Sequence, residues 1–243
     1  MKRKRCAIVM GATSGIGMEV ALLLAKRGWK VGIAGRREER LCRVMDANKG
    51  IAVKKQIDVT AQNAAERLAE MAEELGGMDL YVHSSGIGWQ NTGLDTDKEL
   101  LTVETNGTGF TRMLSAVFNL MAERGGGHIA CITSIAGTKG LGAAPAYSAT
   151  KRYQSHYLEC LTQLAGIRGL DITTTDIRPG FVDTDLIANS HFPLKLPPKA
   201  VAADIVQAIE RKKAVVVIDW RYRLLVALWR LLPRWIWTRM KIQ

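Results

Sequence analysis

A glycine-rich turn near the amino terminus constrains the fold of this chain more than any other stretch; it reads Met10-Gly11-Ala12-Thr13-Ser14-Gly15-Ile16-Gly17. It follows an apolar run, Cys6–Met10, and precedes a helical pattern from Met18 to about Arg27. A strand, a glycine turn and a helix start in this order form a cradle for a dinucleotide pyrophosphate. Gly11 permits the tight turn, Gly15 admits the pyrophosphate to the backbone, and Gly17 lets helix and strand pack closely. Because the spacing is GxxxGxG rather than GxGxxG, a plain strand-to-helix connection is the alternative interpretation.

Length and charge limit the classes of protein to consider. The 243 residues suit one α/β domain with a large core. The formal net charge of +11 is concentrated at the two ends, with four basic residues over Lys2–Arg5 and six basic residues against one acid from Asp219 onward. The stretch between the ends is nearly neutral, so we expect no nucleic-acid partner.

Cysteine usage and hydropathy indicate the compartment. The four cysteines, Cys6, Cys42, Cys131 and Cys160, lie far apart and show no metal-ligand spacing. We therefore expect no metal site and a reducing, cytoplasmic setting. The basic start lacks the apolar core and cleavage site of a signal peptide, and no apolar run reaches 18 residues, so we expect no membrane span.

Apolar runs alternate with helical patterns along most of the chain, as in repeated βαβ units. Strands are expected over 6–10, 31–35, 51–57, 80–83, 128–133, 172–177 and 215–218, and helices over 18–27, around Leu41 and Val44, and over 61–75, 97–122, 146–164 and 200–211. The pattern predicts a doubly wound α/β Rossmann fold, with a seven-stranded parallel sheet flanked by helices. This domain would span residues 1–218, and a basic, Trp-rich helical tail would span 219–243.

Residues at the carboxyl ends of the strands are candidates for ligand binding, because ligands of open α/β sheets bind there. After the second strand the sequence is Gly35-Arg36-Arg37, where an acidic residue would favour a free ribose 2′-hydroxyl. Arg36 and Arg37 instead suit a 2′-phosphate by charge and bidentate geometry, which favours NADP(H) over NAD(H). A solvated basic helix start is the alternative.

Tyr147 and Lys151 are four residues apart near the start of a predicted helix and share a face. A nearby ammonium lowers the pKa of a phenol toward neutrality and equips it for proton transfer, although a YxxxK pair also arises on surfaces by chance. Ser134, at the end of the fifth strand, supplies a hydroxyl for a substrate carbonyl. Asn106, flanked by Gly107 and Gly109, indicates a local distortion of its helix.

Together these residues resemble the short-chain dehydrogenase/reductase family, in its compact single-domain branch. The turn over 11–17, Asp58, Asn106, Ser134, Tyr147, Lys151 and Pro179-Gly180 fall at family positions in the family order. The resemblance implies that Tyr147 is the catalytic acid, that Lys151 lowers its pKa and holds the nicotinamide ribose, and that Ser134 orients the carbonyl. It implies that Asn106 binds a water linking Lys151 to solvent.

The resemblance also implies a set of cofactor contacts. Asp58 and Val59 would contact adenine, and Val182 and Thr184 would hold the carboxamide. The full set is Gly11, Thr13, Ser14, Gly15, Ile16, Gly17, Arg36, Arg37, Asp58, Val59, Ser85, Gly86, Asn106, Tyr147, Lys151, Pro179, Gly180, Val182 and Thr184. The chain departs from the family at His83-Ser84-Ser85-Gly86, where Asn-Asn-Ala-Gly is usual. We interpret His83 as structural, with a ring nitrogen in place of the first Asn.

The tail interleaves Trp, Leu and Arg over residues 220–240. This composition is typical of a helix in a membrane interface, which would make the protein peripheral on the inner face of a membrane. The alternatives are a helix packed on the domain, on a partner subunit or over the substrate pocket. Pro233 should kink or split the helix. The tail also resembles that of reductases of lipid or polyprenyl-linked substrates.

Three functional hypotheses follow. The first is an NADPH-dependent oxidoreductase that reduces a ketone to a secondary alcohol, or the reverse, on a hydrophobic or lipid-linked substrate. The apolar loop over 185–198 would be its substrate lid, although core packing explains that loop equally well. The second is a 3-oxoacyl-carrier-protein reductase whose basic surface docks an acidic carrier, and the third is a non-catalytic NADP-binding, membrane-docking protein. The family resemblance further implies a homodimer or homotetramer built through two long helices.

Overall fold

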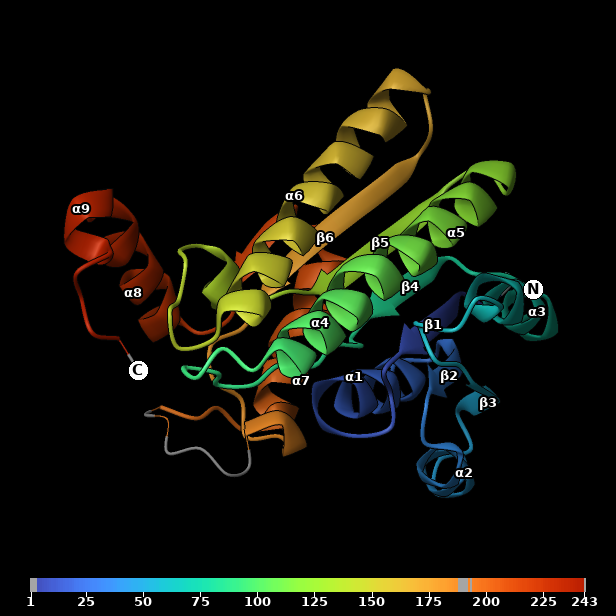
Figure 1. Cartoon of the computed structure of the whole chain (residues 1–243). Coiled ribbons are helices and arrows are strands. Elements are labelled where there is room, and N and C mark those ends of the chain that lie inside the picture. The colour runs from blue at the N-terminus through green and yellow to red at the C-terminus, as the bar shows by residue number, and fades with distance from the viewer. Residues whose placement is uncertain (1–3, 188–191, 193, 243) are drawn as a thin grey trace.

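The computed structural model describes residues 4–187, 192 and 194–242, and its centre is one parallel sheet (Figure 1). The strand order is β3-β2-β1-β4-β5-β6-β7, so the predicted seven-stranded Rossmann-like fold is confirmed. The strands are β1 (Cys6–Met10), β2 (Lys30–Gly35), β3 (Ile51–Gln56), β4 (Leu80–His83), β5 (Gly127–Ile132), β6 (Ile172–Arg178) and β7 (Val215–Val217). Lys2 and Arg3, and part of the expected loop over 185–198, lie outside the described residues.

Helices cover both faces of the sheet, which explains why the strands are continuously apolar. One core contains alternate residues of β1, Ala7 and Val9, with side chains of α1 (Gly15–Lys26), α2 (Glu38–Asp46) and α7 (Pro198–Glu210). The other contains Ile8 and Met10 with side chains of α3 (Ala64–Leu75), α5 (Phe110–Glu123) and α6 (Pro145–Ile167). The alternation within β1 follows from the two-residue period of a strand.

Two helix starts differ from the prediction by three residues. α1 begins at Gly15 rather than Met18, because the glycine turn itself supplies the first helical residues. α3 begins at Ala64 rather than Ala61, since Ala61 N–H donates to the carbonyl of Asp58 in a turn that precedes the helix.

The long helix expected over 97–122 is interrupted where the sequence indicates a distortion. α4 (Thr96–Val103) is followed by a π-helical segment, Glu104–Gly109, and then by α5. A methyl group on Gly109 would lie 2.9 Å from Val59 Cγ2 and 3.0 Å from Val59 O, so this segment approaches the loop after β3 closely. The wider turn presents Asn106 from within the segment.

The tail forms α8 (Trp220–Leu231) and α9 (Arg234–Trp237), and Pro233 separates them as predicted. Asp219 caps α8 by accepting a hydrogen bond from Arg221 N–H at 2.8 Å. Tyr222 and Val226 are buried in the domain core, so the packing alternative is correct for one face of α8. Among the described residues no helix is long and apolar enough to cross a membrane.

Candidate active site

The predicted site residues gather at the carboxyl edge of the sheet, where the glycine turn after β1 lies beside the ends of β2 and β4. A methyl group on Gly17 would lie 2.3 Å from Gly11 O, and one on Gly11 would lie 2.6 Å from Ser85 N. Gly11 also has φ +87°, a backbone region that favours glycine. The turn therefore requires glycine, and it brings its backbone close to the N-terminus of α1, whose free N–H groups suit a pyrophosphate.

Tyr147 and Ser134 face one another beside Lys151. Burial raises the pKa of Tyr147 above its ordinary value, and a hydrogen bond with Ser134 opposes that rise. Ser134 Oγ also accepts from Ala136 N–H at 3.1 Å, which fixes the hydroxyl. Lys151 does not contribute to this shift in the structure, so its effect on the tyrosine pKa stays a prediction.

Lys151 is buried, and its Nζ donates to Ile132 O at 3.1 Å and to Gln154 Oε1 at 3.0 Å. The same Nζ lies 5.7 Å from the ring centroid of Tyr147. Burial lowers the pKa of Lys151 to about 8, against the attraction of Cys131 and Asp176. Lys151 therefore loses its proton around pH 8, where an exposed lysine still carries its full positive charge.

Gln154 is a site residue that sequence reasoning missed. Its Nε2 donates to Asn106 O at 2.9 Å while its Oε1 accepts from Lys151, so one amide joins the lysine to the π-helical segment. The family resemblance assigns a water to this link. The only sequence signal is the spacing of three residues from Lys151, which places both side chains on one face of α6.

The Asn106 side chain holds the loop after β4. Its Oδ1 accepts from Ile87 N–H at 2.9 Å, and its Nδ2 donates to Ile87 O at 2.7 Å and to Thr150 Oγ1 at 3.2 Å. A methyl group on Gly86 would lie 3.3 Å from Asn106 Oδ1 and 3.4 Å from Lys151 Nζ. The structure thus brings Gly86, Asn106 and Lys151 together, as the resemblance implies.

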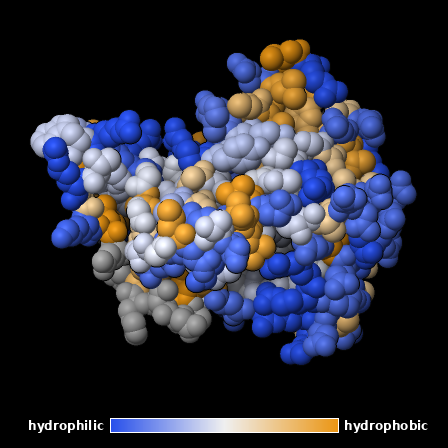
Figure 2. Space-filling view, viewed as in Figure 1, coloured by the Kyte–Doolittle hydropathy of each residue, from blue (hydrophilic) through white to orange (hydrophobic). Residues whose placement is uncertain are grey.

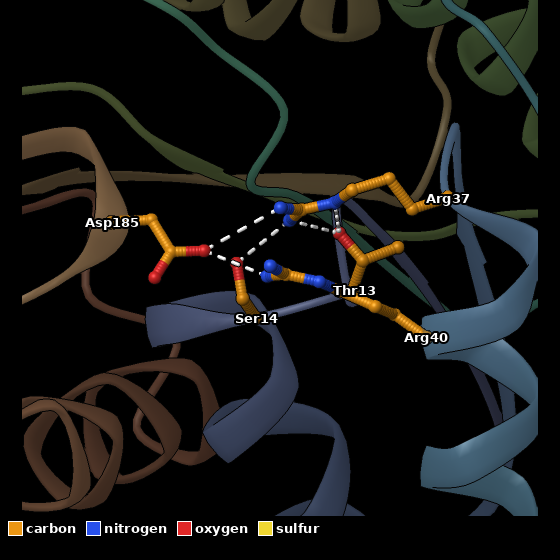
Figure 3. Close-up of polar contacts among 5 residues, drawn as sticks. All are labelled: Thr13, Ser14, Arg37, Arg40 and Asp185. Carbon is orange, nitrogen blue, oxygen red and sulfur yellow. Dashed lines mark hydrogen bonds and ion pairs between the residues drawn. The ribbon is translucent and has the colours of Figure 1, made fainter.

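The arginines after β2 have different surroundings. Arg37 donates to Thr13 Oγ1 through Nε at 3.1 Å and Nη2 at 2.6 Å, and to Ser14 Oγ at 2.8 Å (Figure 3). The Arg36 side chain is exposed, and its backbone oxygen accepts from Gln56. Arg40, which the sequence analysis did not select, points into the same cluster from α2 (Figure 3). Its spacing of three residues from Arg37 was the available signal.

The remaining predicted contacts lie around the same edge. Asp58 Oδ1 accepts from Thr60 N–H and Oγ–H, so it shapes the loop after β3, and Val59 is buried. Pro179 O accepts from Ile135 N–H at 3.1 Å, which joins its loop to the segment after Ser134. A methyl group on Gly15 would lie 3.1 Å from Thr184 Cγ2, so that loop also reaches the glycine turn.

His83 is buried and has a structural environment. Its Nδ1 lies 3.0 Å from Tyr81 Oη, and its ring packs edge-on against Phe110 at 5.1 Å between centroids. Burial first, and Lys151 second, lower the pKa of His83 to about 3, so the ring is neutral at physiological pH. These contacts agree with the structural interpretation of this departure from the family.

The tail borders the segment that follows Ser134. Trp229 Nε1 donates to Thr138 Oγ1 at 2.9 Å, and Trp237 Nε1 donates to Gly140 O at 2.7 Å. A cavity of about 420 Å³ lies between the loop over 140–143 and the tail residues Trp237, Met240 and Ile242. The part of the chain that the structure describes holds no cluster of three or more potential metal ligands.

Known proteins match most of this chain. Residues 5–192 match the family described as short chain dehydrogenase. An uncharacterized oxidoreductase of Myxococcus xanthus is 38% identical over 196 residues, 78% of this chain and 77% of that protein. One of Staphylococcus saprophyticus is 31% identical over 222 residues, 87% and 93% of the two chains.

Solved structures have the same fold. A variant actinorhodin polyketide ketoreductase with NADPH aligns at a TM-score of 0.78 and 28% identity, over 88% of this chain and 95% of that one. A short-chain dehydrogenase/reductase of Burkholderia phymatum in complex with NAD aligns at a TM-score of 0.83 over 93% and 92% of the chains; at 21% identity it supports the fold alone. The chain belongs to the short-chain dehydrogenase/reductase family, and is an oxidoreductase of the nicotinamide-dependent type.

Proposed function

We propose that the protein is an NADP(H)-dependent oxidoreductase that interconverts a ketone and a secondary alcohol on a hydrophobic substrate. The observation that carries the cofactor preference is the Arg37 guanidinium, held between Thr13 and Ser14 beside Gly35, with Arg40 next to it. Guanidinium groups and hydroxyls are the donors that a 2′-phosphate needs, and β2 ends without a carboxylate that would repel it.

The residues divide the chemistry as follows. The nicotinamide cofactor, when bound, supplies or accepts the hydride. Ser134 would hold the carbonyl oxygen, and Tyr147 would give that oxygen its phenolic proton, becoming a phenolate that regains a proton from solvent. Lys151, protonated, would stabilise the phenolate by its charge. The glycine turn would hold the pyrophosphate at the start of α1.

The hydrophobic substrate is supported by the cavity beside the tail, whose wall includes Leu141, Trp237, Met240 and Ile242. Apolar walls favour apolar ligands by excluding water from both surfaces. The division into a domain over 1–218 and a tail over 219–243 is part of this proposal, in which the domain carries catalysis and the tail completes the pocket.

The test is NADPH oxidation with ketones graded from short and polar to long-chain, and with NADH in parallel. Tyr147→Phe should lower turnover by about 10²–10⁴-fold, while Tyr153→Phe on the same helix should leave it intact. Rates that rise with chain length and favour NADPH are the expected result. Activity confined to acyl-carrier thioesters would instead indicate the carrier-protein reductase, and an inactive protein that still binds NADPH would indicate a binding protein.

We also propose a homodimer or homotetramer. Leu100, Leu101, Val103 and Tyr153 are exposed on α4 and α6, and Figure 2 shows apolar surface over these helices. Apolar patches of this kind favour association of copies. Sedimentation should give a particle mass of more than one chain, and Leu101→Arg should lower that particle mass toward the mass of one chain. A monomeric wild type at micromolar concentration would contradict this proposal.

The outer face of α8 supports a peripheral position on the inner face of a membrane. Trp220, Leu224, Leu228 and Leu231 repeat at helical spacing, and each is more than half exposed. Arg221, Arg223 and Arg230 flank this stripe and would meet anionic headgroups.

A further inference from the structure

A carboxylate from the loop after β6 occupies the arginine cluster at the end of β2. Asp185 Oδ2 accepts from Arg40 Nη1 at 2.7 Å and from Arg37 Nη1 at 3.4 Å. Figure 3 shows the carboxylate facing both guanidinium groups, with the Ser14 hydroxyl on the same side as the carboxylate and Thr13 on the far side of the Arg37 guanidinium. Three segments far apart in the chain thus meet around one anionic group.

The donors around Asp185 are those that a phosphate would use. Arg40 foremost, with Arg37 and the Ser14 hydroxyl, holds the pKa of the Asp185 carboxyl below its ordinary value. The carboxyl is therefore ionised at neutral pH. Guanidinium groups bind carboxylates and phosphates in the same bidentate manner, so the two anions are chemically interchangeable at this place.

The residue before Asp185 lies on the other half of the dinucleotide site. Thr184 Cγ2 would be 3.1 Å from a methyl group on Gly15, within the turn that receives the pyrophosphate. Residues 184 and 185 therefore cover the glycine turn and the arginines together. A 2′-phosphate cannot share Arg37 and Arg40 with this carboxylate without strong like-charge repulsion at short range.

We propose that Asp185 is a specificity-determining residue, an internal competitor that the 2′-phosphate of NADP(H) displaces from Arg37 and Arg40. The proposal rests on the proposed preference for NADP(H). A cofactor with a 2′-hydroxyl leaves both Asp185 pairs intact, so this carboxylate does not oppose its binding, whereas a 2′-phosphate must first break both pairs. The 2′-phosphate pairs with both arginines in place of the carboxylate, and it carries more negative charge than the carboxylate does.

The test is binding of two probes that differ only in the 2′-phosphate, 2′,5′-ADP and 5′-AMP, measured by calorimetry at low salt. Asp185→Asn should bind 2′,5′-ADP about three- to tenfold more tightly than the wild type, a range in keeping with two exposed ion pairs. Its affinity for 5′-AMP should change less than about twofold, and about 0.5 M salt should shrink the gain by screening.

Two variants control for trivial causes. Asp204→Asn changes the net charge equally at an exposed position on α7, and should leave both affinities unaltered. Arg37→Ala should weaken 2′,5′-ADP alone. If Asp185→Asn binds 2′,5′-ADP no more tightly, or less tightly, while Arg37→Ala still weakens it, the competitor role is wrong and the NADP(H) preference stands. If the wild type binds both probes equally and Arg37→Ala changes neither, both proposals fall.

Discussion

At the residue scale, the protonation of Lys151 should make the rate of carbonyl reduction depend on pH. Burial lowers its pKa to about 8, and in the proposed mechanism both Lys151 and Tyr147 carry their protons for carbonyl reduction. The rate of reduction should therefore fall as the pH rises through about 8. Gln154→Leu removes an acceptor from the ammonium and should move this inflection to lower pH, whereas Gln154→Glu should move it to higher pH. Profiles of kcat/KM from pH 6 to 10 measure the shift; identical inflections in the three proteins would deny Gln154 a positioning role.

His83 should make the fold sensitive to acid. The pKa of its ring is about 3 when folded, against 6.5 ordinarily, so the unfolded chain binds more protons between these values. The stabilisation that the neutral His83 ring contributes is fully present above pH 6.5 and is lost as the pH falls toward 3. Between pH 7 and pH 4.5 the unfolding free energy of the wild type should fall by about 2 kcal/mol more than that of His83→Asn. Urea titrations of both proteins at the two pH values measure this difference. The exposed His156 is the control, because His156→Asn should reproduce the wild-type dependence.

The residues that sequence predicted share a helix turn or a strand end, as Tyr147 and Lys151 do. Helical spacing alone brings that pair together. The pairing of Asp185 with Arg40 spans 145 residues, and nothing local in either stretch indicates it. Gln154 was missed for another reason, since an amide on an apolar helix face gives no sign of its partners before the π-helical segment is placed.

At the scale of elements, the glycine turn and α1 pack closely against each other. Gly17→Ala would place a methyl group 2.3 Å from Gly11 O, so the helix must shift away from β1. We expect a loss of about 1–3 kcal/mol in unfolding free energy, together with loss of binding by 2′,5′-ADP. Gly166→Ala, in α6, meets no atom within 4 Å and should raise stability by up to about 1 kcal/mol. Chemical denaturation of both variants checks the contrast, which equal effects would contradict.

Element boundaries show where local sequence loses its influence. The order of strands and helices along the chain follows from alternating apolar periods and predicts a parallel sheet, whereas the spatial order of the strands is seen only in the structure. The start of α1 within the glycine turn depends on contact with Ser84 and Ser85, which lie in another βα unit. The inner face of the tail depends likewise on the loop over 138–142. Neither contact is visible within the stretch that makes it.

At the scale of the whole molecule, the basic charge is divided between two distant places. The described chain starts beside α3, where Cys6 Sγ donates to Leu75 O, and helices α8 and α9 lie on the opposite side of the view in Figure 1. The tail must therefore supply its own cations to any anionic surface. Vesicle flotation should show binding to anionic bilayers that weakens with salt. Replacing Trp220, Leu224 and Leu228 by Ser should reduce the bound fraction at least about tenfold, whereas Ile167→Ser on α6 should not; equal flotation of all three proteins would exclude the tail as the contact.

The indole groups of the tail have a practical consequence. Trp229 and Trp237 form an edge-on pair that is hydrogen-bonded to the loop beside Ser134, while Trp220 and Trp235 face outward. The tail thus contains two sets of intrinsic fluorophores, in addition to Trp29 and Trp89 elsewhere in the chain. A ligand entering the cavity should alter the emission of the inner pair, and a lipid surface should shift that of the outer pair to shorter wavelength. Replacing either pair by Phe leaves the other pair to report, so that tryptophan fluorescence distinguishes ligand entry into the cavity from binding to a lipid surface without an added label.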